Sequence, residues 1–194
     1  RTLKANLYRG PYSRPEVEDV PQCQCTLEEG GCGQECYNRS LLMECAPGKC
    51  PTLDLSQGQV YCRNMCIQSR TFPSVEVFKT ADKGWALRVG QDVGPNEVLV
   101  EYLGEVISTG ECLARMARYG SHDDFYFAGL SRGLMLDAKP MGSVARFANH
   151  CCRPNSRMQK WTVRGEVRIV LVSGDEMLPK GTEITYNYGY SEDG

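Results

Sequence analysis

The sequence predicts a mostly β domain that is preceded by a small cysteine-rich module. Eight of the eleven cysteines fall between Cys23 and Cys66, in a stretch with few large apolar residues. From Val75 onward, short strand-like runs rich in β-branched and aromatic residues alternate with turns. Hydrophobic residues make up 41% of the 194-residue chain and charged residues 24%, as in ordinary globular proteins, so both parts are expected to fold.

Residues 1–19 are polar, contain proline and are expected to form an N-terminal arm. This start has neither an initiating Met nor the apolar core of a signal peptide, which predicts a piece of a longer protein rather than a secreted precursor. No apolar run approaches the roughly 20 residues of a membrane helix, so no membrane partner is expected. The net charge of -2 and the pI near 5.8 disfavour a dedicated nucleic-acid binder and favour a basic partner.

Residues 20–70 form the predicted cysteine module, in which the cysteines come in closely spaced pairs. The pairs are Cys23 with Cys25, Cys32 with Cys36, Cys45 with Cys50, and Cys62 with Cys66. Two thiolates about two to five residues apart can reach one tetrahedral zinc ion, and two such pairs complete a site. Eight cysteines could therefore fill two zinc sites, and zinc–thiolate bonds would replace the missing hydrophobic core.

A disulfide framework is the alternative interpretation of an even number of cysteines. Closely spaced pairs do not favour disulfides, and the β domain has three more cysteines without obvious partners, at Cys112, Cys151 and Cys152. Zinc is therefore the favoured interpretation. A zinc module alone could bind nucleic acid or protein, so it does not define the function.

Residues 71–190 form the predicted β domain. Its strand-like runs are "VEVF", "WALRV", "EVLVEYLGEVI", "DFYFAGL", "GLMLDA", "WTV", "VRIVLV" and "TEITYNY". The segment around Gly165 predicts a hairpin turn, since glycine accepts a positive φ. One helix is predicted in "STGECLARMARYG", where Ser108 and Glu111 form a capping box and Gly120 can end the helix. Its apolar stripe comprises Cys112, Leu113, Met116 and Ala117.

The segment "RFANHCCRPN" places His150 directly before two cysteines, and the chain's only other histidine is His122. A cysteine hydrolase is disfavoured, because its nucleophile and base lie on separate segments and need a third residue to orient the histidine. A zinc site made of three consecutive residues is disfavoured by geometry. A buried loop, whose small polar side chains satisfy backbone groups, remains an alternative.

Two further features suggest a ligand site. In "KGWALR", Gly84 next to Trp85 would let the backbone approach a ligand closely. Tyrosines recur in "EYLGEV" and in "TYNYGY", at Tyr102, Tyr186, Tyr188 and Tyr190. They could fill a core or line a narrow aromatic channel.

The four segments "KGWALR", "EYLGEV", "RFANHCCRPN" and "TEITYNY" resemble, in order and spacing, the signature segments of SET-domain lysine methyltransferases. Four ordered motifs are much more specific than one. The cysteine cluster resembles the associated-with-SET module that precedes such domains. Over about residues 20–190, the chain is most similar to the nuclear receptor-binding SET-domain branch, whose members methylate lysine 36 of histone H3. The resemblance implies a SET domain of short strands with a pseudo-knot.

The resemblance also implies the site residues. The cofactor would be S-adenosylmethionine, bound by Lys83, Gly84, Trp85, Tyr126, Arg146, Phe147, Asn149 and His150. Tyr188 would orient the substrate amine and Tyr102 would form a second wall of the lysine channel. Tyr186 occupies the position that sets the number of methyl groups, where a tyrosine implies mono- and dimethylation. Ala86 stands where relatives usually have glycine, which would narrow the approach of the cofactor.

For the module, the resemblance implies two zinc ions that share one thiolate. Cys23, Cys25, Cys32 and Cys36 would bind one ion, and Cys32, Cys45, Cys50 and Cys62 the other, which makes Cys66 spare. Cys152 would bind a third zinc ion together with three cysteines of a post-SET segment. The sequence ends in the tail 191–194, "SEDG", so those three ligands are expected to be missing.

The resemblance therefore implies a histone lysine methyltransferase of the nucleus and of chromatin. Its partners would be the histone H3 tail and the nucleosome, with nucleosomal DNA as a second contact. The alternatives are a catalytically silent SET-like interaction module of chromatin and a zinc-dependent nucleic-acid binder.

Overall fold

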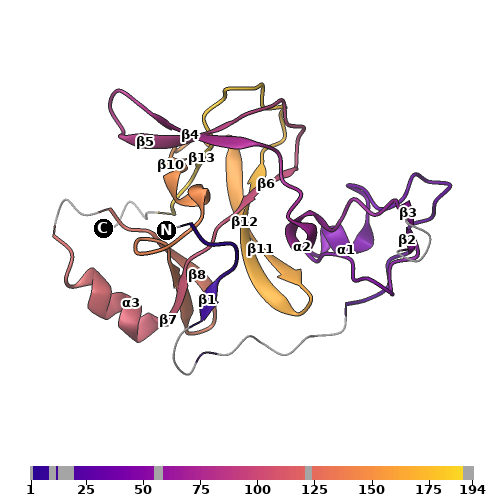
Figure 1. Ribbon diagram of the computed structural model, residues 1–194, viewed down its shortest axis with the longest axis horizontal. Coiled ribbons are helices and arrows are strands. Elements are labelled where there is room, and N and C mark those ends of the chain that lie inside the picture. Colours follow the sequence, from indigo (N-terminus) through magenta and orange to yellow (C-terminus); the bar gives the residue numbers. More distant parts are fainter. Residues whose placement is uncertain (1, 9–11, 13–19, 55–58, 121–123, 190–194) are drawn as a thin grey trace. The chain divides into compact units, whose positions relative to one another are not determined.

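The computed structural model describes residues 2–8, 12, 20–54, 59–120 and 124–189. The chain divides into two compact units, coloured by sequence in Figure 1. The first unit comprises Arg1–Arg14, Pro73–Met158 and Ile169–Gly194, and the second comprises Pro15–Phe72 and Gln159–Arg168. The division near residue 72 lies close to the predicted boundary at residue 70. The assignment of 159–168 to the second unit is not visible in the sequence.

A four-stranded sheet of the first unit has the strand order β1-β7-β9-β8. The strands are β1 (Leu7–Tyr8), β7 (Glu105–Ser108), β9 (Leu134–Asp137) and β8 (Phe127–Ser131). Strand β1 runs parallel to β7, and the other two pairings are antiparallel. All but β1 lie within the predicted strand runs or exceed them by one residue. The predicted N-terminal arm thus contributes a short edge strand, although most of residues 1–19 lie outside the described residues.

A three-stranded sheet has the order β11-β12-β6. It contains β11 (Ser156–Val163), β12 (Glu166–Ser173) and β6 (Val98–Glu101). The two-residue turn between β11 and β12 has positive φ values at Arg164 (52°) and Gly165 (77°). This is the backbone that a tight hairpin requires, as predicted around Gly165.

Two small sheets of the first unit carry three of the four signature segments, whereas "EYLGEV" lies at β6 and β7. Strand β4 (Val75–Lys79) pairs antiparallel with β5 (Trp85–Val89), and β10 (Asn149–His150) pairs parallel with β13 (Thr185–Tyr186). A short 3-10 helix, η1 (Val144–Phe147), leads into β10. It begins at Ser143, whose side chain accepts a hydrogen bond from the backbone amide of Ala145.

Helix α3 (Thr109–Met116) confirms the predicted helix and its cap, because the Ser108 side chain accepts a hydrogen bond from the Glu111 amide at 3.0 Å. The predicted apolar stripe is not a buried face. Cys112 is buried, whereas Leu113 is 61% and Met116 40% exposed.

The interior of the first unit is formed mainly by strand residues. Leu87, Leu99, Leu136 and Leu171 lie in strands, Ile184 directly precedes β13, and each of these side chains is fully buried. Burial of such side chains contributes about 1.5–3 kcal/mol each and makes apolar packing the main stabilising term of this unit. Within the described residues, no helix has the length and apolarity needed to cross a membrane.

The second unit has little regular structure. It contains the single-turn helices α1 (Tyr37–Ser40) and α2 (Cys66–Ser69) and the two-residue strands β2 (Leu53–Asp54) and β3 (Gln59–Val60). Its interior is mostly sulfur, because the buried cluster consists of Leu53 and six cysteines. Buried polar side chains hold the backbone of this unit in place of longer helices and strands. The carboxylate of Glu44 accepts hydrogen bonds from the Ile67 and Gln68 amides at 2.6 and 2.9 Å and so caps α2.

Candidate functional site

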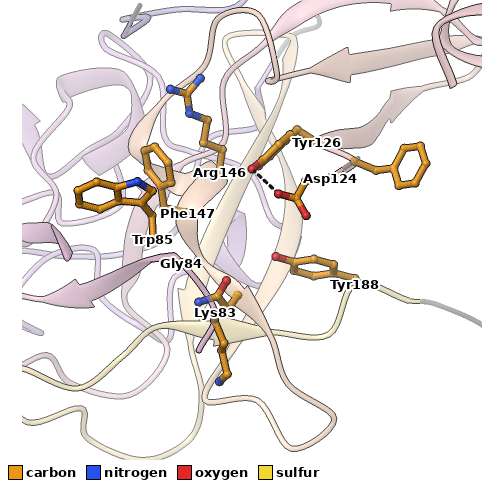
Figure 2. A pocket seen from close by; sticks show the side chains of 10 residues that line it. Lys83, Gly84, Trp85, Asp124, Tyr126, Arg146, Phe147 and Tyr188 are labelled. Carbon is orange, nitrogen blue, oxygen red and sulfur yellow. Dashed lines mark hydrogen bonds between the residues drawn. The ribbon is translucent and has the colours of Figure 1, made fainter. Parts of the chain in front are cut away.

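A cavity of about 290 Å³ lies in the first unit (Figure 2). It is lined by Lys83, Gly84, Trp85, Asp124, Phe125, Tyr126, Arg146, Phe147, Asn149 and Tyr188. The cavity therefore brings together seven of the eight predicted cofactor residues and the predicted catalytic Tyr188. In Figure 2, Trp85 and Phe147 lie on one side of it, and Tyr126 and Tyr188 lie on the other.

The turn before β5 forms one wall with its backbone. The Thr80 amide donates to the Gly84 carbonyl at 2.7 Å, and the Thr80 hydroxyl accepts from the Lys83 amide at 2.9 Å. Gly84 has φ = 75°, and a Cβ built there would meet nothing within 4 Å. Glycine is thus required by conformation, and its open face leaves room for a ligand beside the backbone. Ala86, expected to narrow this approach, is fully buried and is not among the lining residues.

Helix η1 presents the only guanidinium among the lining residues of the cavity. Arg146 donates from Nη1 to the carbonyl of Ala138 at 3.1 Å, and its Cζ lies 4.9 Å from the ring centroid of Phe147. These two contacts fix a positive charge beside aromatic faces. A carboxylate or a ribose-like polar group would find a donor here, and a flat ring would find stacking partners in Trp85 and Phe147.

The loop of residues 146–155 forms a second wall of the cavity, and strand pairing with a distant segment holds it in place. Asn149 lies opposite Thr185 and His150 opposite Tyr186 in the β10–β13 pair. The Asn155 side chain strengthens this pairing, because it donates to the Glu183 carbonyl at 2.7 Å and accepts from the Thr185 amide at 2.9 Å. The polar loop residues therefore satisfy backbone groups, as the buried-loop interpretation expected, and the same loop also lines the cavity.

His150, a predicted cofactor residue, does not line the cavity. Its Nδ1 accepts a hydrogen bond from the Tyr188 amide at 3.2 Å, and the two rings lie 5.3 Å apart at 64°. His150 thus contacts the backbone of Tyr188 rather than the cavity itself. Sequence patterns could not indicate this contact, because it joins residues 38 positions apart.

Three predicted tyrosines cluster behind and beside the cavity. The Tyr188 hydroxyl donates to the Ala148 carbonyl at 2.8 Å, and its ring lies 4.7 Å from that of Tyr186. Tyr102 is buried and donates to the Tyr126 carbonyl at 3.1 Å. Burial, reinforced by the neighbouring Tyr186 and Tyr188, raises the pKa of Tyr102 and keeps its phenol neutral. Tyr190 and His122 lie outside the described residues.

Two lining residues were not predicted individually. Asp124 and Phe125 precede β8, in a segment whose alternation indicated only a strand. The Asp124 carboxylate accepts a long hydrogen bond of 3.5 Å from the Tyr126 hydroxyl, and burial together with this negative charge raises the pKa of Tyr126. A loop residue that faces a cavity carries no periodic signal, so the sequence could not single it out.

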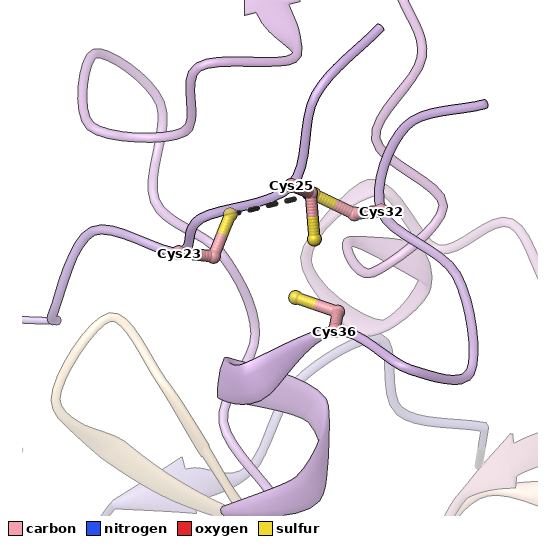
Figure 3. A group of neighbouring side chains, drawn as sticks. All are labelled: Cys23, Cys25, Cys32 and Cys36. Carbon is pink, nitrogen blue, oxygen red and sulfur yellow. Dashed lines mark hydrogen bonds between the residues drawn. The ribbon is translucent and has the colours of Figure 1, made fainter. Parts of the chain in front are cut away.

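The second unit contains two groups of four thiols that could each hold a metal ion. The first group, drawn in Figure 3, is Cys23, Cys25, Cys32 and Cys36, which is the predicted set. The second is Cys23, Cys32, Cys45 and Cys50. The Sγ–Sγ distances of 3.5 Å for Cys23–Cys32 and 3.4 Å for Cys32–Cys50 lie near the edge of about 3.8 Å of a zinc–thiolate tetrahedron. The thiols therefore fit zinc, and none of the eleven cysteines forms a disulfide, which disfavours the disulfide alternative.

The second group differs from the predicted set by having Cys23 where Cys62 was expected. Cys62 is buried next to Cys45, and a hydrogen bond from Cys62 lowers the pKa of Cys45 to about 4. This direction favours the thiolate form that a metal ligand needs. Cys66 belongs to neither group and contacts the Glu44 carboxylate instead.

The double cysteine of the pseudo-knot loop is separate from these groups. The Cys152 thiol is exposed and lies 3.4 Å from Nε2 of His150. The Cys151 thiol donates to the Arg153 carbonyl at 3.3 Å. Within the described residues, neither cysteine belongs to a group of three or more potential metal ligands.

Comparison with known proteins defines the family. A family model described as "SET domain" matches residues 84–189, more than half of the chain. The chain belongs to the SET-domain family. The matched range of this SET domain includes every predicted cofactor and catalytic residue except Lys83.

Relatives share most of this chain. A histone-lysine N-methyltransferase of Mus musculus named "H3 lysine-36 specific" is 41% identical over 178 residues, which cover 89% of this chain and 7% of the relative. The ash1 histone-lysine N-methyltransferase of Drosophila melanogaster is 38% identical over 196 residues, which cover 98% of this chain and 8% of the relative. The chain therefore spans less than a tenth of the length of these relatives.

The SET-domain fold is also found in solved structures. A chain of the polycomb repressive complex 2 of Chaetomium thermophilum, bound to S-adenosylmethionine, has a TM-score of 0.74 and 26% identity. The similarity covers 86% of this chain and 24% of that chain. A structure of the same complex with H3K27me3 and H3K27M has a TM-score of 0.75 at 26% identity, over 87% of this chain and 22% of that chain.

Proposed function

We propose that this chain is the catalytic part of an S-adenosylmethionine-dependent protein lysine N-methyltransferase that acts on lysine 36 of histone H3 in nucleosomes. The observation that carries the proposal is the cavity that gathers Arg146, Asn149 and Tyr188 around the open backbone at Gly84. The names of the relatives, which are histone-lysine N-methyltransferases, support the substrate class. The slightly acidic chain suits a basic histone tail.

The cofactor would occupy the 290 Å³ cavity. When bound, S-adenosylmethionine supplies a methyl group on a positively charged sulfur. The open backbone of the Lys83–Trp85 turn would receive its carboxylate, and the aromatic side chains of Trp85 and Phe147 would stack against flat or cationic parts of the ligand. Arg146 and Asn149 would complete the polar contacts, because both are already oriented by the carbonyl of Ala138 and the carboxylate of Glu183.

The tyrosines would prepare the nucleophile. Methyl transfer to an amine is an in-line displacement that requires alignment and a neutral amine. A lysine ammonium that enters an apolar aromatic site next to a positive sulfur has a lowered pKa, since desolvation and like charge both disfavour its charged form. Its proton leaves to water before transfer. The hydroxyl of Tyr188 would then orient the amine lone pair, and Tyr102 would form the opposite wall.

Tyr186 would limit the product to mono- and dimethylated lysine. Its ring lies 4.7 Å from that of Tyr188, so its hydroxyl can hold a water molecule in the space that a third methyl group would need. The Tyr186→Phe variant is expected to shift the products toward trimethyllysine, measured by mass spectrometry of the modified histone. An unchanged distribution of products would contradict this role.

Substrate binding would use strand addition and charge. The histone tail would add to an exposed strand edge of the SET domain, where backbone hydrogen bonds give affinity. A nucleosome would also bring DNA close to the chain. The two thiol groups would hold zinc and keep the second unit folded. These features are those of a nuclear chromatin enzyme.

The decisive experiment is to incubate the protein with nucleosomes and S-adenosylmethionine labelled on its methyl group, and then to map the labelled lysine by mass spectrometry. We expect label on lysine 36 of histone H3 and a loss of at least about a hundredfold in kcat for Tyr188→Phe. Tyr37→Phe is the matched control, since Tyr37 is an exposed tyrosine of the second unit and should leave kcat unchanged.

Two outcomes would reject the proposal. Label on another substrate in preference to lysine 36 would reject the substrate. Binding of S-adenosylmethionine without transfer to any protein would favour a catalytically silent SET-like interaction module.

A further inference from the structure

A cluster of charged side chains connects α3 to the sheet that it covers. The Arg115 guanidinium donates from Nη1 to Asp137 at 2.7 Å and to Glu105 at 2.8 Å, and from Nε to Glu111 at 2.9 Å. Asp137 is fully buried, Glu105 is nearly so, and Arg115 retains 23% of its side-chain exposure. Three carboxylates therefore share one guanidinium, and removal of that guanidinium would leave buried negative charges facing one another.

Asp137 is the last residue of β9, and the segment after it runs to the cofactor cavity. The second carboxylate oxygen of Asp137 accepts a hydrogen bond from the Lys139 amide at 2.9 Å. Between these two residues, the Ala138 amide donates to the Tyr126 carbonyl at 3.0 Å. The Ala138 carbonyl in turn accepts from the Arg146 guanidinium at 3.1 Å. One peptide segment thus anchors two lining residues of the cavity.

The segment Asp137–Lys139 is packed tightly against its neighbours. A Cβ at Gly104 would approach the Asp137 carbonyl oxygen to 2.7 Å, and a Cβ at Gly142 would approach Ala138 atoms to 2.9 Å. Ala138 is fully buried between these two glycines. Tight packing transmits a displacement rather than absorbing it, so a shift of Asp137 would reach Tyr126 and Arg146.

We propose that Arg115 is a positioning residue of the cofactor cavity, which holds Asp137 so that the Ala138 peptide presents Tyr126 and Arg146 to the ligand. Arg115 itself does not line the cavity and would not touch the cofactor. The inference rests on the proposed function, because the ligand used to test it is S-adenosylmethionine. Helix α3 would then support cofactor binding through Arg115, and its exposed apolar residues would take no part.

The pH dependence of a variant follows from the groups around Asp137. These groups are Arg115, Glu111 and Cys112 of α3, Glu105 of β7, and Tyr102. In Arg115→Met, the Glu105 and Asp137 carboxylates would face each other without a cation, so burial and like charge would disfavour two negative charges side by side. At low pH one of them is protonated and the two can share the proton. As the pH rises, both ionise and repel, so the cavity should bind the cofactor less well.

The test is the Kd for S-adenosylmethionine by calorimetry, as the ratio of variant to unsubstituted protein at each pH. For Arg115→Met we expect a ratio of about threefold near pH 6 that grows to about tenfold near pH 8.5. In the double variant Arg115→Met/Asp137→Asn, only the Glu105 carboxylate of the pair remains charged. The ratio of Kd values should then no longer increase with pH. Arg118→Met is the matched control, since Arg118 is exposed in the following turn and should leave Kd unchanged at every pH.

The outcomes separate this inference from the proposed function. If the unsubstituted protein does not bind S-adenosylmethionine, both the proposed function and the positioning role of Arg115 are rejected. Binding by the unsubstituted protein with a pH-independent ratio near one in Arg115→Met would overturn the positioning role alone. If Arg115→Met does not fold, Arg115→Lys is the variant to test. A lysine keeps the positive charge but lacks the planar guanidinium that bonds several carboxylates at once. A weakened Kd in folded Arg115→Lys supports the role, and an unchanged Kd overturns it.

Discussion

The two units of this chain are stabilised by different interactions. In the first, fully buried leucines and isoleucines from several strands form an apolar interior. In the second, six buried cysteines and one leucine form the main cluster, and the helices are single turns. The first unit can fold by hydrophobic burial, whereas the second has less apolar area and has thiol groups that could hold metal ions in its place.

In the second unit, buried polar side chains also orient and stabilise the cysteine cluster. In the second unit, buried amides face the sulfur atoms: Asn38 donates to Cys45 at 3.6 Å, and Asn64 donates to it at 3.5 Å. Each amide also donates to a backbone carbonyl, of Pro21 or Met43, at 2.8 Å, which fixes its orientation. Such donors stabilise a thiolate in a buried site.

Removal of zinc should have the largest effect and should affect only one unit. Treatment with a strong chelator is expected to unfold residues 20–70, since structural zinc contributes on the order of 10 kcal/mol to the folding of such modules. Hydrogen exchange measured by mass spectrometry should show lost protection there and retained protection in β6, β7 and β9. Protection of residues 20–70 that survives complete removal of the metal would contradict the proposed origin of their stability.

A cavity in the apolar interior should produce the opposite pattern. Leu136→Ala truncates a fully buried side chain and is expected to lower the free energy of unfolding of the first unit by about 3 kcal/mol. Zinc content, measured by atomic emission, should remain that of the unsubstituted protein. Leu113→Ala is the control, because Leu113 is 61% exposed and its truncation should change stability by less than about 0.5 kcal/mol.

Loss of one amide donor to sulfur should weaken zinc retention without removing a ligand. Asn64→Leu keeps the side-chain volume but removes the donor to Cys45, and we expect zinc affinity to fall by about tenfold. Competition with a chromogenic chelator measures this change. Ser40→Ala, an exposed substitution in the same unit, serves as the control. Equal affinity in Asn64→Leu and Ser40→Ala would show that the amide does not support the thiolate.

The smallest effect is expected at the cap of α3. Ser108→Ala removes the acceptor of the Glu111 amide and should lower the free energy of unfolding of the first unit by about 1 kcal/mol. Denaturant titration followed by tryptophan fluorescence or circular dichroism measures this loss. Ser131→Ala, at an exposed position of β8, should have little effect, and an equal loss in both variants would argue against the cap.

The local patterns of the sequence predicted much of the first unit. Short runs rich in β-branched and aromatic residues indicated β4, β5, β9 and β12, and Gly165 indicated the hairpin turn, because strand propensity and turn chemistry act over a few residues. The same reasoning missed β10, since its two residues form a strand only through pairing with β13 more than 30 positions later. Helical periodicity identified the apolar stripe of α3, but it cannot tell whether a partner covers that face, and Leu113 and Met116 are exposed.

The candidate site shows the same limit. The resemblance identified most of the residues that line the cavity, but Asp124 and Phe125 required coordinates. The task proposed for Arg115 also required them, because it depends on a contact with Asp137 across 22 positions. In the second unit, spacing indicated pairs of thiols. It could not decide whether Cys23 or Cys62 lies in the second group, since that depends on where a loop returns.

The assignment of residues 159–168 to the second unit has a consequence for how this protein can be divided. Trp161, at the tip of the β11–β12 hairpin, is almost fully buried, and the Arg39 guanidinium lies 5.4 Å from its ring centroid. The zinc module is therefore discontinuous in sequence. Gene fusion or recombination that moved residues 20–72 as a single segment would leave one of its walls behind, so the two units are expected to be inherited together.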